Sequence, residues 1–135
     1  MRTLTGLCST AAVVTALSCL SCSSTAPAPS SVTGRWTGSA VVGPEQWNFD
    51  LLLVQANDSV RGQATVRSVP ARFTNEMDVR GTVSGDSVQL LLRPIEDANI
   101  NIVANVTPAH LAGRMWLNAF TQDTHAIALD RQAAP

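Results

Sequence analysis

Cysteine is the residue type whose placement most restricts the chemistry of this chain. All three cysteines, Cys8, Cys19 and Cys22, lie near the N-terminus of the 135 residues. A disulfide framework would spread its cysteines through the fold, so this clustering argues against one. A thiolate is the nucleophile that a lipid-transfer reaction needs near neutral pH, and cysteine supplies it. The clustering therefore indicates chemistry on the N-terminal segment.

The sequence around these cysteines has the features of an export signal. Arg2 and the α-amino group are positive, and Leu7–Leu20 carries no charge. This run is shorter than the roughly 20 apolar residues of a membrane-spanning helix and fits the core of a signal peptide. The alternative, a buried helix of the mature fold, explains the position and the flanking charge less well.

One short motif in this segment resembles the lipobox of bacterial lipoproteins. In Ala16-Leu17-Ser18-Cys19, a small residue precedes a cysteine, which in that family receives the lipid; Cys22 is the alternative acceptor. The resemblance implies a lipoprotein signal peptide over residues 1–18 and a lipid-anchored protein of the bacterial cell envelope. Because Leu20 rather than Asp follows Cys19, it implies the outer membrane. A secreted or periplasmic protein is the alternative.

The next segment lacks the residues that a folded core needs. Residues 19–32 are rich in Ser, Ala and Pro, a composition typical of flexible linkers. We expect residues 19–32 to form a tether and residues 33–135 to form one folded domain.

Two histidines and the aspartates near them are the candidates for metal binding. His110 and His125 lie at expected strand edges or turns, and Asp123 or Asp130 would have to supply a third ligand. The domain contains no metal-binding spacing such as HExxH or CxxC. We expect solvated histidines, no metal and no cofactor.

Other catalytic signals are weak as well. Glu96 and Asp97 are adjacent, and neighbouring strand residues point to opposite faces, so they do not suit a paired acid and base. The sequence has no Gly-x-Ser-x-Gly elbow and no Lys for Schiff-base or P-loop chemistry. We expect no catalytic residues and no enzymatic activity.

The composition limits the class of protein and of partner. Apolar residues make up 45% of the chain and charged residues 14%, with 9 basic and 10 acidic residues and a net charge of −1. The low charge argues against disorder, and the absence of excess positive charge argues against nucleic acid as a partner. The length suits a single domain.

From Gly34 onward the dominant pattern is alternation between apolar and polar residues, which indicates short strands. Turn signals such as Ser84-Gly85-Asp86-Ser87 separate them, and a weaker strand is expected at Ala71–Phe73. The expected inward rows are Trp47/Phe49/Leu51/Leu53, Val60/Gly62/Ala64/Val66, Val79/Gly81/Val83, Val88/Leu90/Leu92, Ile100/Ile102/Ala104/Val106 and Leu111/Gly113/Met115/Leu117, with a last strand around Ala126–Leu129.

About eight short strands joined by short turns predict an all-β antiparallel meander. A sheet of this length must curl or close, so we expect a small up-and-down barrel; a β-sandwich is the alternative. Gly62, Gly81 and Gly113 each lie near a strand start, where glycine permits strong curvature. The competing interpretation of these glycines is close approach of a ligand to the backbone.

Gly34, Trp36 and Arg131 together resemble the signature of the calycin superfamily, which includes lipocalins and avidins. Gly34-Arg35-Trp36 opens the first expected strand, and Arg131 lies at the end of the last. The resemblance implies a barrel in which Trp36 closes one end and Arg131 packs across it. An arginine stacked on an indole is worth about 1 kcal/mol beyond its burial.

The expected barrel could be hollow or filled. Small inward residues would leave space for an apolar molecule, whereas the large inward side chains, Trp36 and Leu90 among them, could occupy it. The candidate cavity residues are Ala40, Trp47, Phe49, Ala64, Ala104 and Met115.

A second candidate site lies outside the expected barrel. Alternation places Leu52, Trp116 and Phe120 opposite the inward rows, where exposed apolar groups would mark a contact face. A bulge that turns the aromatic residues inward is the alternative. Two function classes follow: a non-enzymatic envelope lipoprotein that binds a small apolar or amphipathic ligand, or an interaction module that binds an envelope protein, as an inhibitor or an assembly subunit.

Overall fold

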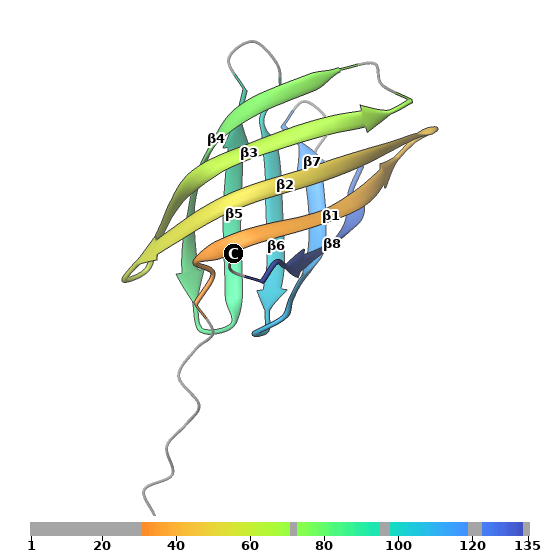
Figure 1. The fold of residues 1–135 in the computed structure, drawn as a ribbon. Coiled ribbons are helices and arrows are strands. Elements are labelled where there is room, and N and C mark those ends of the chain that lie inside the picture. Colours follow the sequence, from red (N-terminus) through yellow and green to blue (C-terminus); the bar gives the residue numbers. More distant parts are fainter. Residues whose placement is uncertain (1–30, 71–72, 95–97, 119–122, 134–135) are drawn as a thin grey trace, which may run out of the picture.

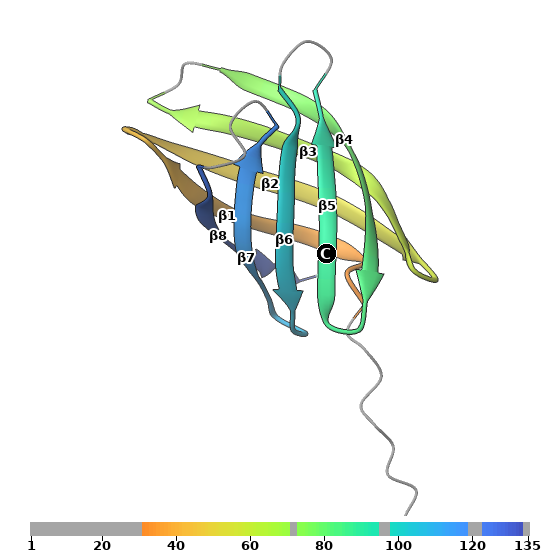
Figure 2. The same ribbon diagram turned by 180° about the vertical axis from the view of Figure 1, so that it is seen from behind.

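The computed structural model describes residues 31–70, 73–94, 98–118 and 123–133. The expected signal peptide, Cys19, Cys22 and most of the expected tether lie outside these ranges. The described chain forms one sheet that closes on itself (Figures 1 and 2). Its strands are β1 (Gly34–Val42), β2 (Glu45–Ala56), β3 (Ser59–Val69), β4 (Thr74–Ser84), β5 (Ser87–Arg93), β6 (Ile100–Val106), β7 (His110–Leu117) and β8 (His125–Arg131).

Each strand pairs with the next in antiparallel orientation, and β8 returns to pair with β1. The closing register runs from Trp36 opposite Arg131 to Ala40 opposite Ile127. The predicted up-and-down barrel is therefore confirmed. The sandwich alternative is wrong because all eight strands belong to one closed sheet and do not form two packed sheets. Among the described residues there is no helix long and apolar enough to cross a membrane.

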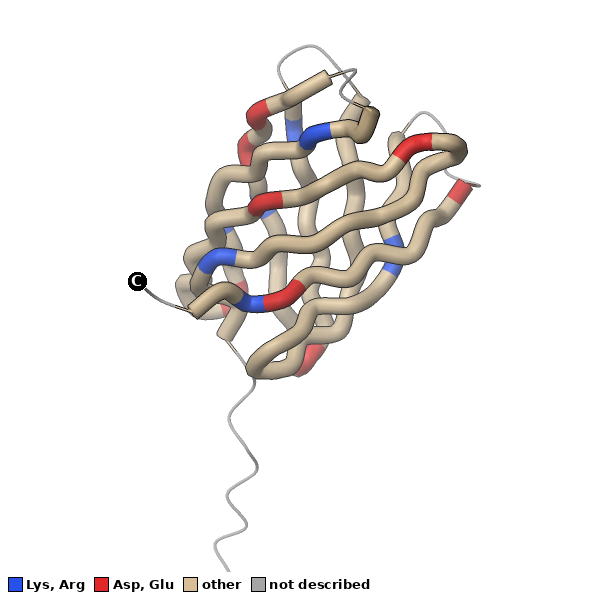
Figure 3. The backbone as a smooth tube through the Cα atoms, turned by 45° about the vertical axis from the view of Figure 1, so that its right-hand side comes forward, with Lys and Arg blue, Asp and Glu red and all other residues tan. Residues whose placement is uncertain are grey.

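Alternation within the strands produces the core. Alternate side chains point into the barrel, and most of them are buried, while their neighbours face solvent. Acidic and basic positions are interspersed along the strands (Figure 3). Burial at about 25 cal/mol per Å² of apolar surface is the main force that closes such a sheet. The largest fully buried side chains are Trp36, Leu51, Leu53, Leu92, Ile100, Ile102, Leu111, Met115 and Leu129.

Four inward glycines let adjacent strands approach closely. A Cβ placed on Gly62 would lie 1.9 Å from the carbonyl oxygen of Leu52 on β2. A Cβ on Gly38, Gly81 or Gly113 would likewise lie 2.0–2.1 Å from a carbonyl oxygen of the adjacent strand. The curvature interpretation of these glycines therefore holds, because the group that a side chain would strike is protein backbone.

The two ends of the barrel differ in their connections. One end carries the turns 57–58, 85–86 and 107–109 and both ends of the described chain; we call it the closed end (lower in Figure 1). The other end carries the connections 43–44, 70–73, 94–99 and 118–124, three of which are longer; we call it the mouth.

Two expectations at these ends need correction. Phe73 is not in a strand: its N–H donates to Ser68 Oγ and its carbonyl accepts from the Ser68 N–H, and β4 begins at Thr74. Ala71 and Arg72 lie outside the described residues. Val32, which we placed in the tether, is fully buried in the core, so the folded domain includes a residue N-terminal to the expected boundary.

Candidate functional site at the mouth of the barrel

An apolar hollow of about 340 Å³ lies at the mouth. Strands β2, β4, β6 and β7 present the ends of their inward rows to it, because each of these strands begins or ends at this level. Most of its lining side chains are large and apolar or aromatic, and the others are one asparagine and one exposed alanine. The lining residues are Trp47, Phe73, Asn75, Met77, Ala98, Ile100 and Leu117.

Two aromatic residues form one wall of this hollow. The rings of Trp47 and Phe73 meet edge to face, with centroids 5.2 Å apart and planes at 89°, a favourable arrangement of aromatic quadrupoles. Ser68 fixes the backbone of Phe73 through two hydrogen bonds, and the Trp47 indole N–H donates to Glu45 Oε2 at 3.3 Å. The wall is thus positioned by polar groups around its edge.

A second hollow, of about 270 Å³, shares Leu117 with the first. Val42, Gly43, Asp123 and His125 complete its lining. His125 is the first inward position of β8, in phase with the buried Ile127. This second hollow therefore adds a carboxylate and an imidazole beside the apolar one.

A groove of about 250 Å³ lies on the outer wall, between β3, β4 and β5. Its lining is mainly polar and charged, and includes Glu76, Asp78 and Arg93. Met77 lines both this groove and the apolar hollow. Because Arg93, the last residue of β5, pairs with Asp78, the part of β4 before Asp78 extends past the end of β5.

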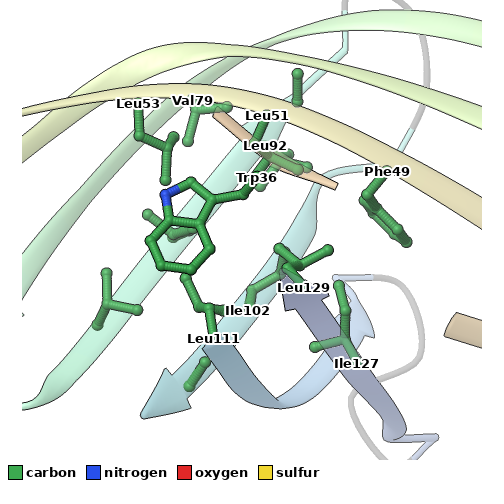
Figure 4. Close-up of a cluster of buried hydrophobic side chains, with 14 of the residues drawn as sticks. Trp36, Phe49, Leu51, Leu53, Val79, Leu92, Ile102, Leu111, Ile127 and Leu129 are labelled. Atoms are coloured by element: carbon green, nitrogen blue, oxygen red, sulfur yellow. The ribbon is translucent and has the colours of Figure 1, made fainter. Parts of the chain in front are cut away.

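The closed end is tightly packed. The Trp36 indole is fully buried and lies among Leu53, Val79 and Leu111 (Figure 4). The guanidinium carbon of Arg131 lies 4.4 Å from the centre of the Trp36 ring, the contact that the family resemblance implied.

The N-terminal residues of the described chain are held across this closed end. Arg131 donates from Nη1 to the carbonyl oxygen of Thr33 at 2.6 Å and from Nη2 to that of Ser31. Trp36 Nε1 donates to the carbonyl oxygen of Val32 at 2.9 Å, and the Val32 N–H donates to Gln55 Oε1 at 3.0 Å. Segment 31–33 therefore covers this end of the barrel.

The structure does not gather the six candidate cavity residues around one space. Trp47 lines the apolar hollow, and Ala64 lines the outer groove. The other four, Ala40, Phe49, Ala104 and Met115, are at most 3% exposed and belong to the packed core. The large inward side chains fill the middle of the barrel, so space for a ligand is found at its mouth.

Two of the three candidate outer-face residues, Leu52 and Trp116, lie within the described ranges. Leu52 is 57% exposed and its neighbour Val54 is 58% exposed on the outer face of β2. Trp116 is half-buried at an outward position of β7, opposite Asn101. Phe120 lies outside the described residues.

The histidines do not form a metal centre with the described residues, which contain no group of three or more His, Cys, Asp or Glu side chains suited to an ion. His110 Nδ1 lies 2.6 Å from Asp130 Oδ1, and both side chains are exposed at the closed end. His125 and Asp123 lie at the mouth instead. Glu96 and Asp97 lie outside the described residues.

An ion pair links β1 and β2 on the outer wall. Arg35 donates to both carboxylate oxygens of Asp50, at 2.9 and 2.6 Å. These hydrogen bonds are the main reason that the pKa of Asp50 lies below its ordinary value. The pair is solvent-exposed and has no part in the mouth.

Sequence reasoning missed most of the hollow. Met77, Asn75, Ala98 and Phe73 were not among the candidate residues, and Ile100 and Leu117 were assigned only to inward rows. A usable signal was present for the strand residues: inward positions at the strand ends next to the longer connections must line the wider opening. Phe73 gave no such signal because it lies between strands.

Neither a protein-family model nor a curated protein matches this sequence. A solved structure that resembles it is a de novo designed fluorescence-activating β-barrel, with a TM-score of 0.61 and 12% sequence identity over 74% of this chain and 93% of the designed one. At this identity, the likeness concerns the fold alone.

Proposed function

We propose that this protein is a non-enzymatic, lipid-anchored envelope protein that binds a small apolar or amphipathic ligand at the mouth of its barrel. The observation that carries the proposal is the apolar hollow of about 340 Å³ between Trp47, Phe73 and Leu117. Its volume lies within the range of roughly 300–1,000 Å³ typical of small-molecule sites, which are mainly apolar with a few polar groups.

The size of the hollow limits the ligand. A single short alkyl chain or one ring system fits such a space. Release of water from the partly exposed apolar walls formed by Trp47, Phe73 and Leu117 would provide the main driving force.

The proposal of anchoring at the cell envelope rests on the sequence, and the structure indicates from which end of the barrel such an anchor would extend. The lipobox-like motif ends at Cys19, and segment 31–33 is fixed at the closed end by Arg131 and Trp36. A lipid on Cys19 would thus attach the barrel through its closed end and leave the mouth free. The stacking of Arg131 on Trp36 also supports a calycin-like arrangement.

Binding can be tested with the neutral apolar dye N-phenyl-1-naphthylamine, whose own fluorescence rises in an apolar site. We compare Ala98→Trp, which places a bulky side chain in the hollow, with Ala109→Trp, which places it in an exposed turn at the closed end. We expect the first substitution to weaken dye binding by about tenfold or more and the second to leave it unchanged. Equal binding by both variants would contradict a site at the mouth.

Native mass spectrometry of the mature protein from its own envelope tests both parts of the proposal. We expect a small bound mass that is released on denaturation, and acyl chains on Cys19. An acylated Cys22 would move the anchor to the alternative site. A bare, unacylated chain would contradict both the ligand and the lipid.

The exposed pair Leu52 and Val54 supports a second candidate function, binding of an envelope protein on the outer face of β2. The double substitution Leu52→Ser and Val54→Ser should then remove a cross-linked partner from the envelope without affecting dye binding. If the cross-linking pattern does not change, this second candidate is wrong.

A further inference from the structure

We propose that the ligand of the mouth is amphipathic and carries a hydrogen-bond-donating head, an ammonium or a hydroxyl group, that lies beside Asp123 and His125. This inference rests on the proposed function, because it assigns the polar end of a molecule whose apolar end occupies the hollow at Trp47. It excludes a carboxylate head such as that of a fatty acid.

The two hollows at the mouth form the first part of the argument. Leu117 lines both of them, so they adjoin at this residue. The first is walled by Trp47 and Phe73, and the second contains Asp123 and His125. A molecule that fills the apolar space and passes Leu117 therefore reaches a carboxylate and an imidazole.

The orientation of His125 forms the second part. Its register partner on β7 is the buried Met115, and both side chains belong to inward rows. His125 is half-buried at the level where β8 begins. A neutral imidazole offers one acceptor nitrogen and one donor N–H, whereas a carboxylate offers only acceptors. Together, His125 and Asp123 suit a head group that donates hydrogen bonds.

The charges around the mouth form the third part. Asp123 lines the second hollow, and Glu45 accepts a hydrogen bond from Trp47 beside the first. An arginine, Arg93, lines the outer groove, but it shares that groove with two carboxylates, Glu76 and Asp78. Like charges repel strongly where solvent is partly excluded. An anionic head in the second hollow would therefore face the carboxylate of Asp123.

A series of ligands with identical tails separates the head from the tail. We would displace the bound dye from the full domain with decylamine, 1-decanol and undecanoate at neutral pH, below their micelle concentrations. Because all three carry the same ten-carbon alkyl chain, differences in affinity report the head group. We expect decylamine and 1-decanol to bind at least about fivefold more tightly than undecanoate.

Matched substitutions at the two ends of the barrel assign the effect to a residue. Asp123→Asn removes the negative charge at the mouth, and Asp130→Asn removes one at the closed end. We expect Asp123→Asn to reduce the preference for decylamine over undecanoate to within about twofold, and Asp130→Asn to leave that preference unchanged. His125→Phe should weaken 1-decanol binding selectively.

The outcomes distinguish the inference from the function on which it rests. Equal displacement by the three ligands, or tighter binding of undecanoate, overturns the head-group assignment while the apolar site stands. A preference that persists in Asp123→Asn overturns the role of that carboxylate. If the dye does not bind to the wild-type domain, the proposed function and this inference both fail.

Discussion

The closed end and the mouth are built from the same strands but use their inward side chains differently. At the closed end, Trp36 is fully buried, Arg131 stacks on it, and Val32 completes the packing. At the mouth, Trp47 and Leu117 are only partly buried around open space. The closed end is therefore packed in a way that stabilises the fold, whereas the mouth keeps partly exposed apolar side chains around a hollow.

The largest effect that tests this division is expected from truncation of the closed-end tryptophan. Trp36→Ala removes a fully buried side chain and should lower the free energy of unfolding by about 3–5 kcal/mol through lost burial and the cavity left behind. Trp47→Ala, at the mouth, should cost about 1–2 kcal/mol because the ring is already partly exposed. Denaturant unfolding measures both values. Similar losses for the two variants would contradict the division.

The close approach of neighbouring strands between the two ends can be tested by substituting glycines. Gly62→Ala would place a Cβ 1.9 Å from the Leu52 carbonyl oxygen, so the two strands must separate, at a cost of about 3 kcal/mol. Gly43→Ala, at the mouth, meets no atom within 4 Å and should cost about 1 kcal/mol, from its positive φ alone. Thermal and denaturant unfolding provide the comparison. A tolerated Gly62→Ala would mean that curvature does not require this glycine.

Most of the barrel could be predicted because alternation carries the information locally. The rows that include Leu51, Ala64 and Ile102 point inward because successive strand residues face opposite sides of a sheet, and the turn at Gly85 is marked by its residue types. Closure follows because so many strands in one sheet leave two edges that pair with each other.

The location of the hollow could not be predicted in the same way. It depends on which strand ends meet the longer connections and on how the large inward side chains fill the centre, and a periodic pattern records neither. Phe73 lies in a connection without alternation, and Ser68 positions it through hydrogen bonds. Val32 follows a segment of tether-like composition, and its burial depends on tertiary contacts, including hydrogen bonds with the nearby Trp36 and with Gln55 on β2.

A smaller effect is expected from the arginine that covers the closed end. Arg131→Gln loses the stacking on Trp36 and the hydrogen bonds to the carbonyl oxygens of Ser31 and Thr33, and should destabilise the domain by about 1–2 kcal/mol. Hydrogen exchange should accelerate at residues 31–33, whereas exchange around the mouth should not change. Faster exchange at the mouth as well would mean that the two ends are coupled.

The smallest effect is expected on the outer wall, where Arg35 and Asp50 pair in solvent. Because the pKa of Asp50 is lowered in the folded state, mainly by its hydrogen bonds with Arg35, the pair stabilises the fold above the unfolded-state pKa of about 3.9. That contribution disappears as the pH falls through the lower, folded-state pKa. Arg35→Met should raise the pKa of Asp50 toward its ordinary value in a carboxyl NMR titration, while Arg61→Met, on the outer face of β3, should leave it unchanged. Screening by solvent keeps the contribution of this ion pair to the free energy of unfolding small. A large decrease in the free energy of unfolding of Arg35→Met would therefore show that the outer wall, and not the packed interior, supports this region of the barrel.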